Sequence, residues 1–291
     1  MTFDEAMQRG EVRQAVEEIE RDLAGDRVPA KLFMLFQLKA VLEDFDAAQA
    51  ALDDIRRLQP HTAPLLDDLA TCLAADRQRC ARRSDPGIAE RRRGIGAPPP
   101  FQLSLIKATV LFAQKDKAGA AKAVAEARAQ MPKVTGTLTP LSGEKIRFLD
   151  LSDSDDLLGP VLETVHPQGV VDMPFCQLKA VKLRTINGFQ DALWIPAEIE
   201  LAEGKTVSTR LPSQYPGSGN HGFPQVRLGN VTMWDREGGV TIGFGQRDLR
   251  LITPTGETMV GLRQVARIDF DVAAGEQPKK GFWQRLLSRS A

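Results

Sequence analysis

The spacing of apolar residues changes near residue 133, and this change constrains the fold more strongly than any other feature of the sequence. Before this point, apolar side chains recur every three or four residues, which is the period of an amphipathic helix. After it, short β-branched runs alternate with Gly, Pro and Asn, which is typical of short strands. We therefore predict two domains, an α-helical one at residues 1–133 and a β-rich one at residues 134–272.

The first domain is predicted to consist of helical hairpins. Apolar stripes run from Val12 to Leu23, from Leu32 to Leu42 and from Ala48 to Leu58, and further helices fit residues 64–83, 99–114 and 117–130. The segment that begins at Ala15 (Ala-Val-Glu-Glu-Ile) is similar in type to those that begin at Ala51 and Ala123. The first two are separated by nearly the period of about 34 residues that tetratricopeptide repeats have. We expect tetratricopeptide-like hairpins, with a plain helical bundle as the alternative, and either offers a groove for a peptide.

The second domain is predicted to be mainly antiparallel. Apolar residues alternate with polar ones over residues 195–201 and 207–211, on either side of Glu203-Gly204, which is typical of a hairpin with one face in water. A short helix is predicted near residues 156–165, capped by Asp155 or Asp156. The fold class is therefore α+β, and the β-rich half is expected to form a small barrel or a sandwich.

The charge is balanced overall but uneven along the chain. Lys plus Arg and Asp plus Glu both number 38, which argues against a protein that coats nucleic acid along its length. Residues 1–68 hold 8 basic and 15 acidic side chains, whereas residues 69–133 hold 13 basic and 5 acidic ones. Residues 77–93 are rich in arginine. We interpret them as a solvated helix end and loop, with a docking surface for an acidic partner as the alternative.

No constellation of residues predicts a catalytic, cofactor or metal site. Ser218 lies three residues before His221 in a Gly-rich stretch, without the spacing of a nucleophile elbow. The histidines are isolated, and Cys72, Cys80 and Cys176 form no C-x-x-C motif, so neither a metal site nor a disulfide framework is expected. The aspartates at 150, 153, 155 and 156 lack the glycine of a calcium loop and are interpreted as helix caps.

The C-terminal residues form a separate segment. Residues 273–291 are predicted to be a basic amphipathic tail, with Phe282, Trp283, Leu286 and Leu287 at helical spacing. Such a segment suits an anionic membrane or the groove of a partner. It is too short to hold a membrane by itself, so a free or self-docked tail is favoured over membrane contact through residues 279–291. The N-terminus carries neither a basic start nor an apolar run, so the expected location is the cytoplasm.

Several stretches of the sequence, in order, resemble the ImpE-type (TagJ-type) accessory proteins of bacterial type VI secretion. In the second half they are Leu158-Gly-Pro-Val-Leu-Glu, Leu193-Trp-Ile-Pro-Ala-Glu-Ile-Glu-Leu, Tyr215-Pro-Gly-Ser and Gly243-Phe-Gly-Gln-Arg; in the first half they are Leu35-Phe-Gln-Leu and Phe45-Asp-Ala-Ala-Gln-Ala-Ala-Leu. The resemblance covers most of residues 10–270. The sequence departs from the family pattern after Pro216-Gly-Ser, where Gly219 and Asn220 stand in place of the usual acidic residue.

The resemblance implies a non-enzymatic cytoplasmic adaptor. Proteins of this family are thought to bind the N-terminal helix of the small subunit of the contractile sheath. They are also linked to the hexameric ATPase that disassembles the sheath. An amphipathic helix of this kind suits a groove between helical hairpins. The family has no known catalytic residues to carry over.

Seven residues are candidates for contact with a partner. They are large apolar or polar side chains that are expected to be exposed and that the predicted fold does not obviously require: Trp194, Tyr215, Trp234, Gln246, Arg247, Phe33 and Phe36. The alternative for the aromatic residues is core packing, and for Arg247 it is an ordinary solvent-facing strand position. Two other functions stay open, an enzyme with a site near Ser218 and His221, and a membrane-surface scaffold that uses the tail.

Overall fold

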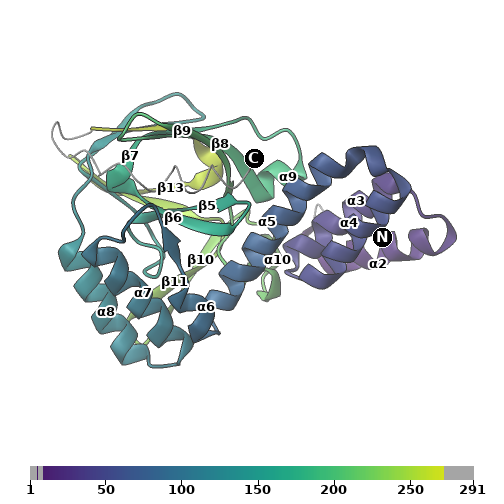
Figure 1. Cartoon of the computed structure of the whole chain (residues 1–291), viewed down its shortest axis with the longest axis horizontal. Helices are drawn as coiled ribbons and strands as arrows, with labels where there is room; N and C mark the ends of the chain where they lie inside the picture. The colour runs from purple at the N-terminus through teal and green to yellow at the C-terminus, as the bar shows by residue number, and fades with distance from the viewer. Residues whose placement is uncertain (1–4, 6–8, 272–291) are drawn as a thin grey trace.

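The structure joins a helical half to a β-rich half along one long helix. The computed structural model describes residue 5 and residues 9–271. The predicted tail at residues 273–291 lies outside the described residues. In Figure 1 the N-terminal helices lie at the right, the strands at the upper left, and α5 (Ala63–Arg82) runs between them. Helices α7 (Pro100–Ala113) and α8 (Lys117–Gln130) lie below the strands in this view. The α+β fold class is confirmed.

The helices follow the predicted stripes closely. Those that match are α2 (Val12–Gly25), α3 (Pro29–Val41), α4 (Phe45–Leu58), α5, α7 (Pro100–Ala113) and α8 (Lys117–Gln130). Three short helices in the described chain were not predicted: α6 (Pro86–Glu90), α9 (Phe189–Leu193) and α10 (Pro224–Arg227). Proline stands in the first turn of α3, α5, α6 and α7, where its missing N–H costs nothing. The three alanines of the sequence repeat, Ala15, Ala51 and Ala123, are all buried. Their small side chains allow the helices to approach closely.

The α3–α4 and α7–α8 hairpins share the same turn. Glu43 and Lys115 occupy the left-handed region, with φ of 57° and 66°, immediately after α3 and α7. Asp44 and Asp116 follow them and cap the next helix, where each carboxylate accepts a hydrogen bond from a backbone N–H. The two turns lie 72 residues apart, which is the separation of the repeat segments that begin at Ala51 and Ala123 and twice the 36 residues between Ala15 and Ala51.

The β-rich half contains one large sheet and two small ones. Its strands are β1 (Arg93–Gly94), β2 (Gly136–Pro140), β3 (Ile146–Phe148), β4 (Asp150–Asp153), β5 (Val161–His166), β6 (Gly169–Pro174), β7 (Leu178–Leu183), β8 (Trp194–Leu201), β9 (Thr206–Pro212), β10 (Thr232–Glu237), β11 (Val240–Gly245), β12 (Asp248–Thr253), β13 (Gly256–Gly261) and β14 (Val265–Phe270). The large sheet has the order β1-β6-β5-β9-β8-β7-β14-β2-β3, and only the β1–β6 pair is parallel. β13-β12-β4 and β10-β11 form the small sheets.

The large sheet is open, so the predicted small barrel is wrong. Its order runs from β1 to β3 without closing. Leu151 of β4 and Leu249 and Leu251 of β12 share one apolar cluster with Val181 and Ile199 of the large sheet. The three-stranded sheet therefore packs on the large one, as in a sandwich. No described helix is both long and apolar enough to cross a membrane.

The short helix predicted near residues 156–165 is wrong. Residues 154–160 form turns, and Val161–His166 is strand β5, which pairs with β6 and β9. All six residues of β5 are buried, so the strand lacks the polar–apolar alternation that marks a half-exposed strand. The aspartates before it therefore do not cap a helix.

Candidate partner-binding site

Buried ion pairs hold α5 against the β-rich half. Arg79 Nε donates to Glu163 Oε2 of β5 at 2.8 Å, and Arg82 Nη1 lies 3.3 Å from both Glu163 Oε1 and Asp172 Oδ1 of β6. Arg92, after α6, donates from Nε to Asp172 Oδ2 at 2.6 Å. All five side chains are buried. Removing any one of them leaves an uncompensated charge in the interior, so the pairs fix the position of the helix.

These contacts correct the interpretation of the arginine-rich segment. Within residues 77–93, Arg79, Arg82 and Arg92 are neither solvated nor available to an acidic partner, because they are buried in the network. The sequence does contain a signal for this. Glu163 follows Val161 and Leu162, and Asp172 stands between Val171 and Met173, and a carboxylate buried among apolar residues requires a cationic partner.

A second buried cluster accounts for Arg247 and Tyr215. Arg247 Nη2 donates to Asp153 Oδ2 at 2.8 Å, and the Tyr215 hydroxyl donates to Asp153 Oδ1 at 2.8 Å. The exposed fraction is 0% for Arg247 and 1% for Tyr215. The expectation that they are exposed is therefore wrong, and so is the solvent-facing alternative for Arg247; both side chains are part of the interior. Asp153 and Asp155, interpreted from the sequence as helix caps, are ion-pair partners instead; Asp155 pairs with Arg83 at 2.6 Å.

The buried charges shift several pKa values. Burial alone opposes ionisation of Glu163, but the positive charges of Arg79 and Arg247 outweigh it and lower the pKa to about 2. Burial raises the pKa of Tyr215, helped by the negative charge of Asp153, and so keeps the phenol protonated as a donor. The clusters are therefore ionic or hydrogen-bonded in the folded protein near neutral pH.

Trp194 and Phe36 also belong to the junction between the halves. The exposed fraction of Trp194 is 1%, and its ring stacks on that of Phe36 of α3 with the centroids 6.0 Å apart. Its Nε1 donates to Asp76 Oδ2 of α5 at 2.7 Å. Phe36 is fully buried. Both side chains therefore hold the N-terminal helices on the β-rich half.

Ser218 is occupied by backbone contacts. Its hydroxyl donates to the carbonyl of Tyr215 at 2.5 Å and accepts from the Gly245 N–H at 2.7 Å. His221 Nδ1 accepts from the Phe223 N–H, and its ring packs on Phe244. The two side chains thus serve to shape a loop. Within the described chain, no group of three His, Cys, Asp or Glu residues is arranged to hold a metal ion.

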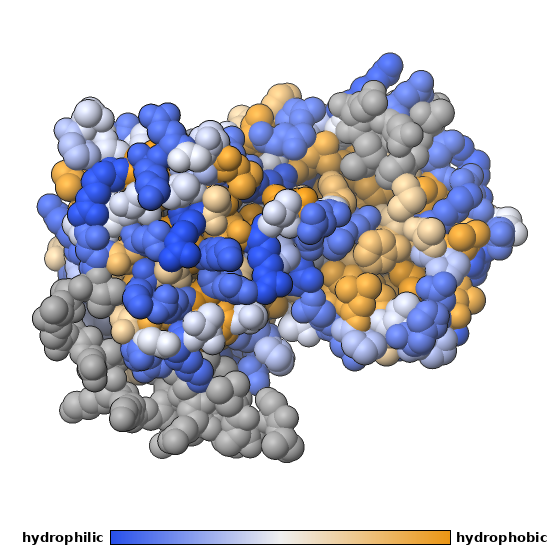
Figure 2. Space-filling model, turned by 90° about the horizontal axis from the view of Figure 1, so that it is seen from above, coloured by the Kyte–Doolittle hydropathy of each residue, from blue (hydrophilic) through white to orange (hydrophobic). Residues whose placement is uncertain are grey.

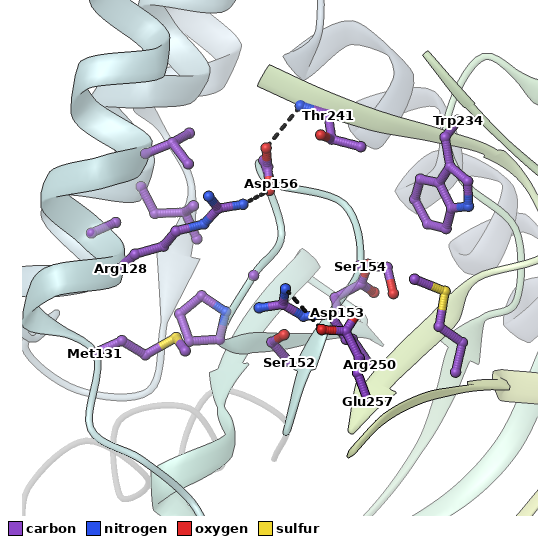
Figure 3. Close-up of a pocket in the computed structure, with 16 residues that line it drawn as sticks. Arg128, Met131, Ser152, Asp153, Ser154, Asp156, Trp234, Thr241, Arg250 and Glu257 are labelled. Atoms are coloured by element: carbon purple, nitrogen blue, oxygen red, sulfur yellow. Dashed lines mark hydrogen bonds and ion pairs between the residues drawn. The ribbon is translucent and has the colours of Figure 1, made fainter. Parts of the chain in front are cut away.

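Trp234 is a partly exposed candidate residue that lines a cavity. The cavity has a volume of about 210 Å³ and lies between α8, the turn that follows β4, the strand β10 and the three-stranded sheet. Figure 3 shows Arg128 and Met131 on one side, Trp234 on the other, and Arg250 and Glu257 between them. The exposed fraction of Trp234 is 37%.

The Trp234 ring is positioned by the buried clusters. It meets the ring of Tyr215 edge-on, with the centroids 5.5 Å apart. The two rings come this close because residue 243 is glycine: a Cβ there would lie 2.5 Å from Tyr215 and 2.9 Å from Trp234. The Arg247–Asp153–Tyr215 contacts therefore support the wall of the cavity from behind.

The floor of the cavity is one face of the three-stranded sheet. Ser152, Arg250 and Met259 stand opposite one another across β4, β12 and β13, so their side chains share a face. Met259 is 50% exposed. Ser154 Oγ, also at the cavity, is buried and has no hydrogen-bond partner. The residues of α8 thus cover only part of this face.

The remaining candidates lie elsewhere. Gln246 is half-buried after β11, where its backbone bridges to Gln214. Phe33 of α3 is half-buried and packs on Phe36, with the ring centroids 5.8 Å apart. Figure 2 shows apolar atoms gathered over the N-terminal helices at the right of the molecule. The half-buried Phe33, Met34 and Leu35 of α3 contribute to this apolar surface on the helical half, apart from the cavity.

Three comparisons with known proteins agree with this architecture. Residues 145–269 match the model of a family described as ImpE protein. Over 275 residues the chain is 29% identical to the type VI secretion system accessory component TagJ of Pseudomonas aeruginosa, an alignment that covers 93% of this chain and 92% of TagJ. The resemblance seen in the sequence is confirmed.

A solved structure shares the fold. Protein VPA1032 of Vibrio parahaemolyticus matches with a TM-score of 0.80 over 94% of this chain and 98% of that one. The two sequences are only 16% identical, so the match concerns the fold alone. The helical and β-rich halves thus occur together in another protein.

Proposed function

We propose that this chain, whose residues 145–269 are an ImpE domain, is an accessory component of a bacterial type VI secretion system. The observation that carries the proposal is the likeness to TagJ, which extends over 93% of this chain and 92% of TagJ. It therefore includes both halves and the long helix that joins them. A likeness confined to the helical hairpins would support only a general peptide-binding role.

The role within the system that we propose is that of a non-enzymatic cytoplasmic adaptor. It binds the N-terminal helix of the small sheath subunit and connects it to disassembly of the sheath by the hexameric ATPase. The resemblance to ImpE-type proteins supports these partners. Two surfaces suit an amphipathic helix, the apolar surface that includes Phe33 and the cavity beside Trp234.

Co-purification tests this function. The full chain is immobilised by a tag and mixed with the small sheath subunit of the same secretion system, either intact or without its first helix. We expect the intact subunit to be retained and the truncated one to be lost. Loss of the intact subunit, or equal retention of both forms, would contradict the proposed role.

A further inference from the structure

We propose that the cavity between α8, β10 and β13 binds one large apolar side chain of the partner segment, with a carboxylate beside it facing Arg250. This inference rests on the proposed function and adds the place and chemistry of the contact. The cavity of about 210 Å³ is smaller than the roughly 300–1,000 Å³ of small-molecule pockets. Its size suits a side chain rather than a whole cofactor.

The walls have the composition of a protein-binding site. Met131 and Met259 stand at the cavity with Trp234, and Leu105 and Ala127 extend its apolar lining. Methionine adapts its shape to different side chains, and tryptophan is enriched among the residues that dominate binding energy at interfaces. Because Met259 is 50% and Trp234 37% exposed, docking of an apolar side chain would remove apolar surface from water.

The rim supplies a cation for the partner's carboxylate. Arg250 Nη1 forms an ion pair with Glu257 Oε2 of the same cavity at 3.8 Å, which is beyond hydrogen-bond distance, so the guanidinium keeps N–H donors for a second acceptor. Arg128 differs, because it pairs closely with the buried Asp156. A carboxylate on the partner can accept from Arg250 in a two-pronged arrangement. The occupant is therefore an amphipathic segment with an acidic residue next to its apolar anchor.

An unsatisfied polar atom lies beside the cavity. Ser154 Oγ is buried without a partner, although buried hydroxyls usually form hydrogen bonds. Rotation of the Ser154 side chain toward the cavity would let its hydroxyl donate to a carbonyl of a docked segment. The same cavity thus offers an apolar wall, a cation at the rim and a hydroxyl beside it.

Calorimetry with the full chain tests this assignment. The probe is a synthetic peptide of the N-terminal helix of the small sheath subunit. Met259→Asp places a charge against the apolar anchor, and Arg250→Glu reverses the charge at the rim. We expect each change to weaken binding at least about 10-fold. A peptide whose acidic residues are replaced with lysine should bind the Arg250→Glu variant again. The same peptide should bind the unchanged protein more weakly than the original peptide does.

Matched controls use the turn between β2 and β3. Leu141→Asp and Lys145→Glu make the same chemical changes at exposed positions that do not line the cavity. They should leave the affinity within about 2-fold of the unchanged protein. Unweakened binding to both cavity variants overturns the assignment while the proposed function stands. If the unchanged protein does not bind the peptide, the proposed helix contact fails, and the assignment fails with it.

Discussion

At the scale of single residues, Arg247 is the most consequential buried charge. It is fully buried and neutralises Asp153, and it also lies 3.8 Å from Glu163. Arg247→Met leaves these carboxylates partly unpaired in the interior, so we expect the free energy of unfolding to fall by about 3–5 kcal/mol. Urea unfolding measures the change. Arg267→Ala, which breaks the exposed pair with Asp269, should cost no more than about 1 kcal/mol. Equal costs for the two changes would refute the account of the network.

His166 makes stability depend on pH. Burial lowers its pKa in the folded protein from 6.5 to about 4. Between these pH values the unfolded chain binds a proton at His166 that the folded protein does not bind. The contribution of His166 to the free energy of unfolding therefore falls as pH decreases from 6.5 to 4. We expect this loss to approach about 3 kcal/mol. Urea unfolding at several pH values should show that the free energy of unfolding depends less on pH in His166→Gln than in the unchanged protein. The same pH dependence in both proteins would contradict the prediction.

At the scale of secondary structure elements, the repeated hairpin turn gives a paired test. Lys115 and Glu43 hold left-handed conformations that favour glycine, but Glu43 Oε1 also accepts a hydrogen bond from the Gly217 N–H at 2.7 Å. A residue other than glycine pays about 1–2 kcal/mol for the left-handed conformation. Glycine avoids this cost but loses more backbone entropy on folding, so the net gain is smaller. We therefore expect Lys115→Gly to stabilise the protein by about 0.5–1 kcal/mol, and Glu43→Gly to give no gain. Thermal unfolding distinguishes them; a similar gain from both would show that the Gly217 contact contributes nothing.

The elements also show where prediction from the sequence succeeds and where it ends. Helices α2 to α5, α7 and α8 follow from apolar stripes, prolines and aspartate caps, because these signals are local. Strand β5 was predicted as a helix because a strand buried on both faces carries no alternation. Arg79 and Glu163 are 84 positions apart, so their pairing depends on the tertiary fold, and the exposure of Tyr215 and Arg247 was misjudged for the same reason.

At the scale of the whole molecule, we predict a single cooperative unfolding transition despite the two halves. One apolar cluster combines residues of α2–α5 with Val165, Val170 and Trp194 of the β-rich half. The ion pairs of α5 cross the same junction. Far-ultraviolet and near-ultraviolet circular dichroism during urea unfolding should therefore give coincident curves. Two separated transitions would show that the halves unfold independently.

The distribution of charge has a different meaning in the folded molecule. In the sequence the arginine-rich residues 77–93 are interpreted as a solvated helix end and loop, with a docking surface as the alternative, but three of these arginines neutralise carboxylates of β5 and β6 inside the protein. A partner therefore meets a surface with fewer free arginines than the composition indicates. The cavity beside Trp234 and the apolar surface that includes Phe33 are therefore better candidates for partner contact than the arginine-rich segment.

Photo-crosslinking of the full chain to the small sheath subunit tests the central claim most directly. Benzoylphenylalanine is placed singly at position 259, at position 33 or at the exposed position 141. We expect an adduct from position 259 that maps to the N-terminal helix of the subunit, and no adduct from position 141. An adduct from position 33 alone, or one from position 259 that maps elsewhere on the subunit, would contradict this expectation.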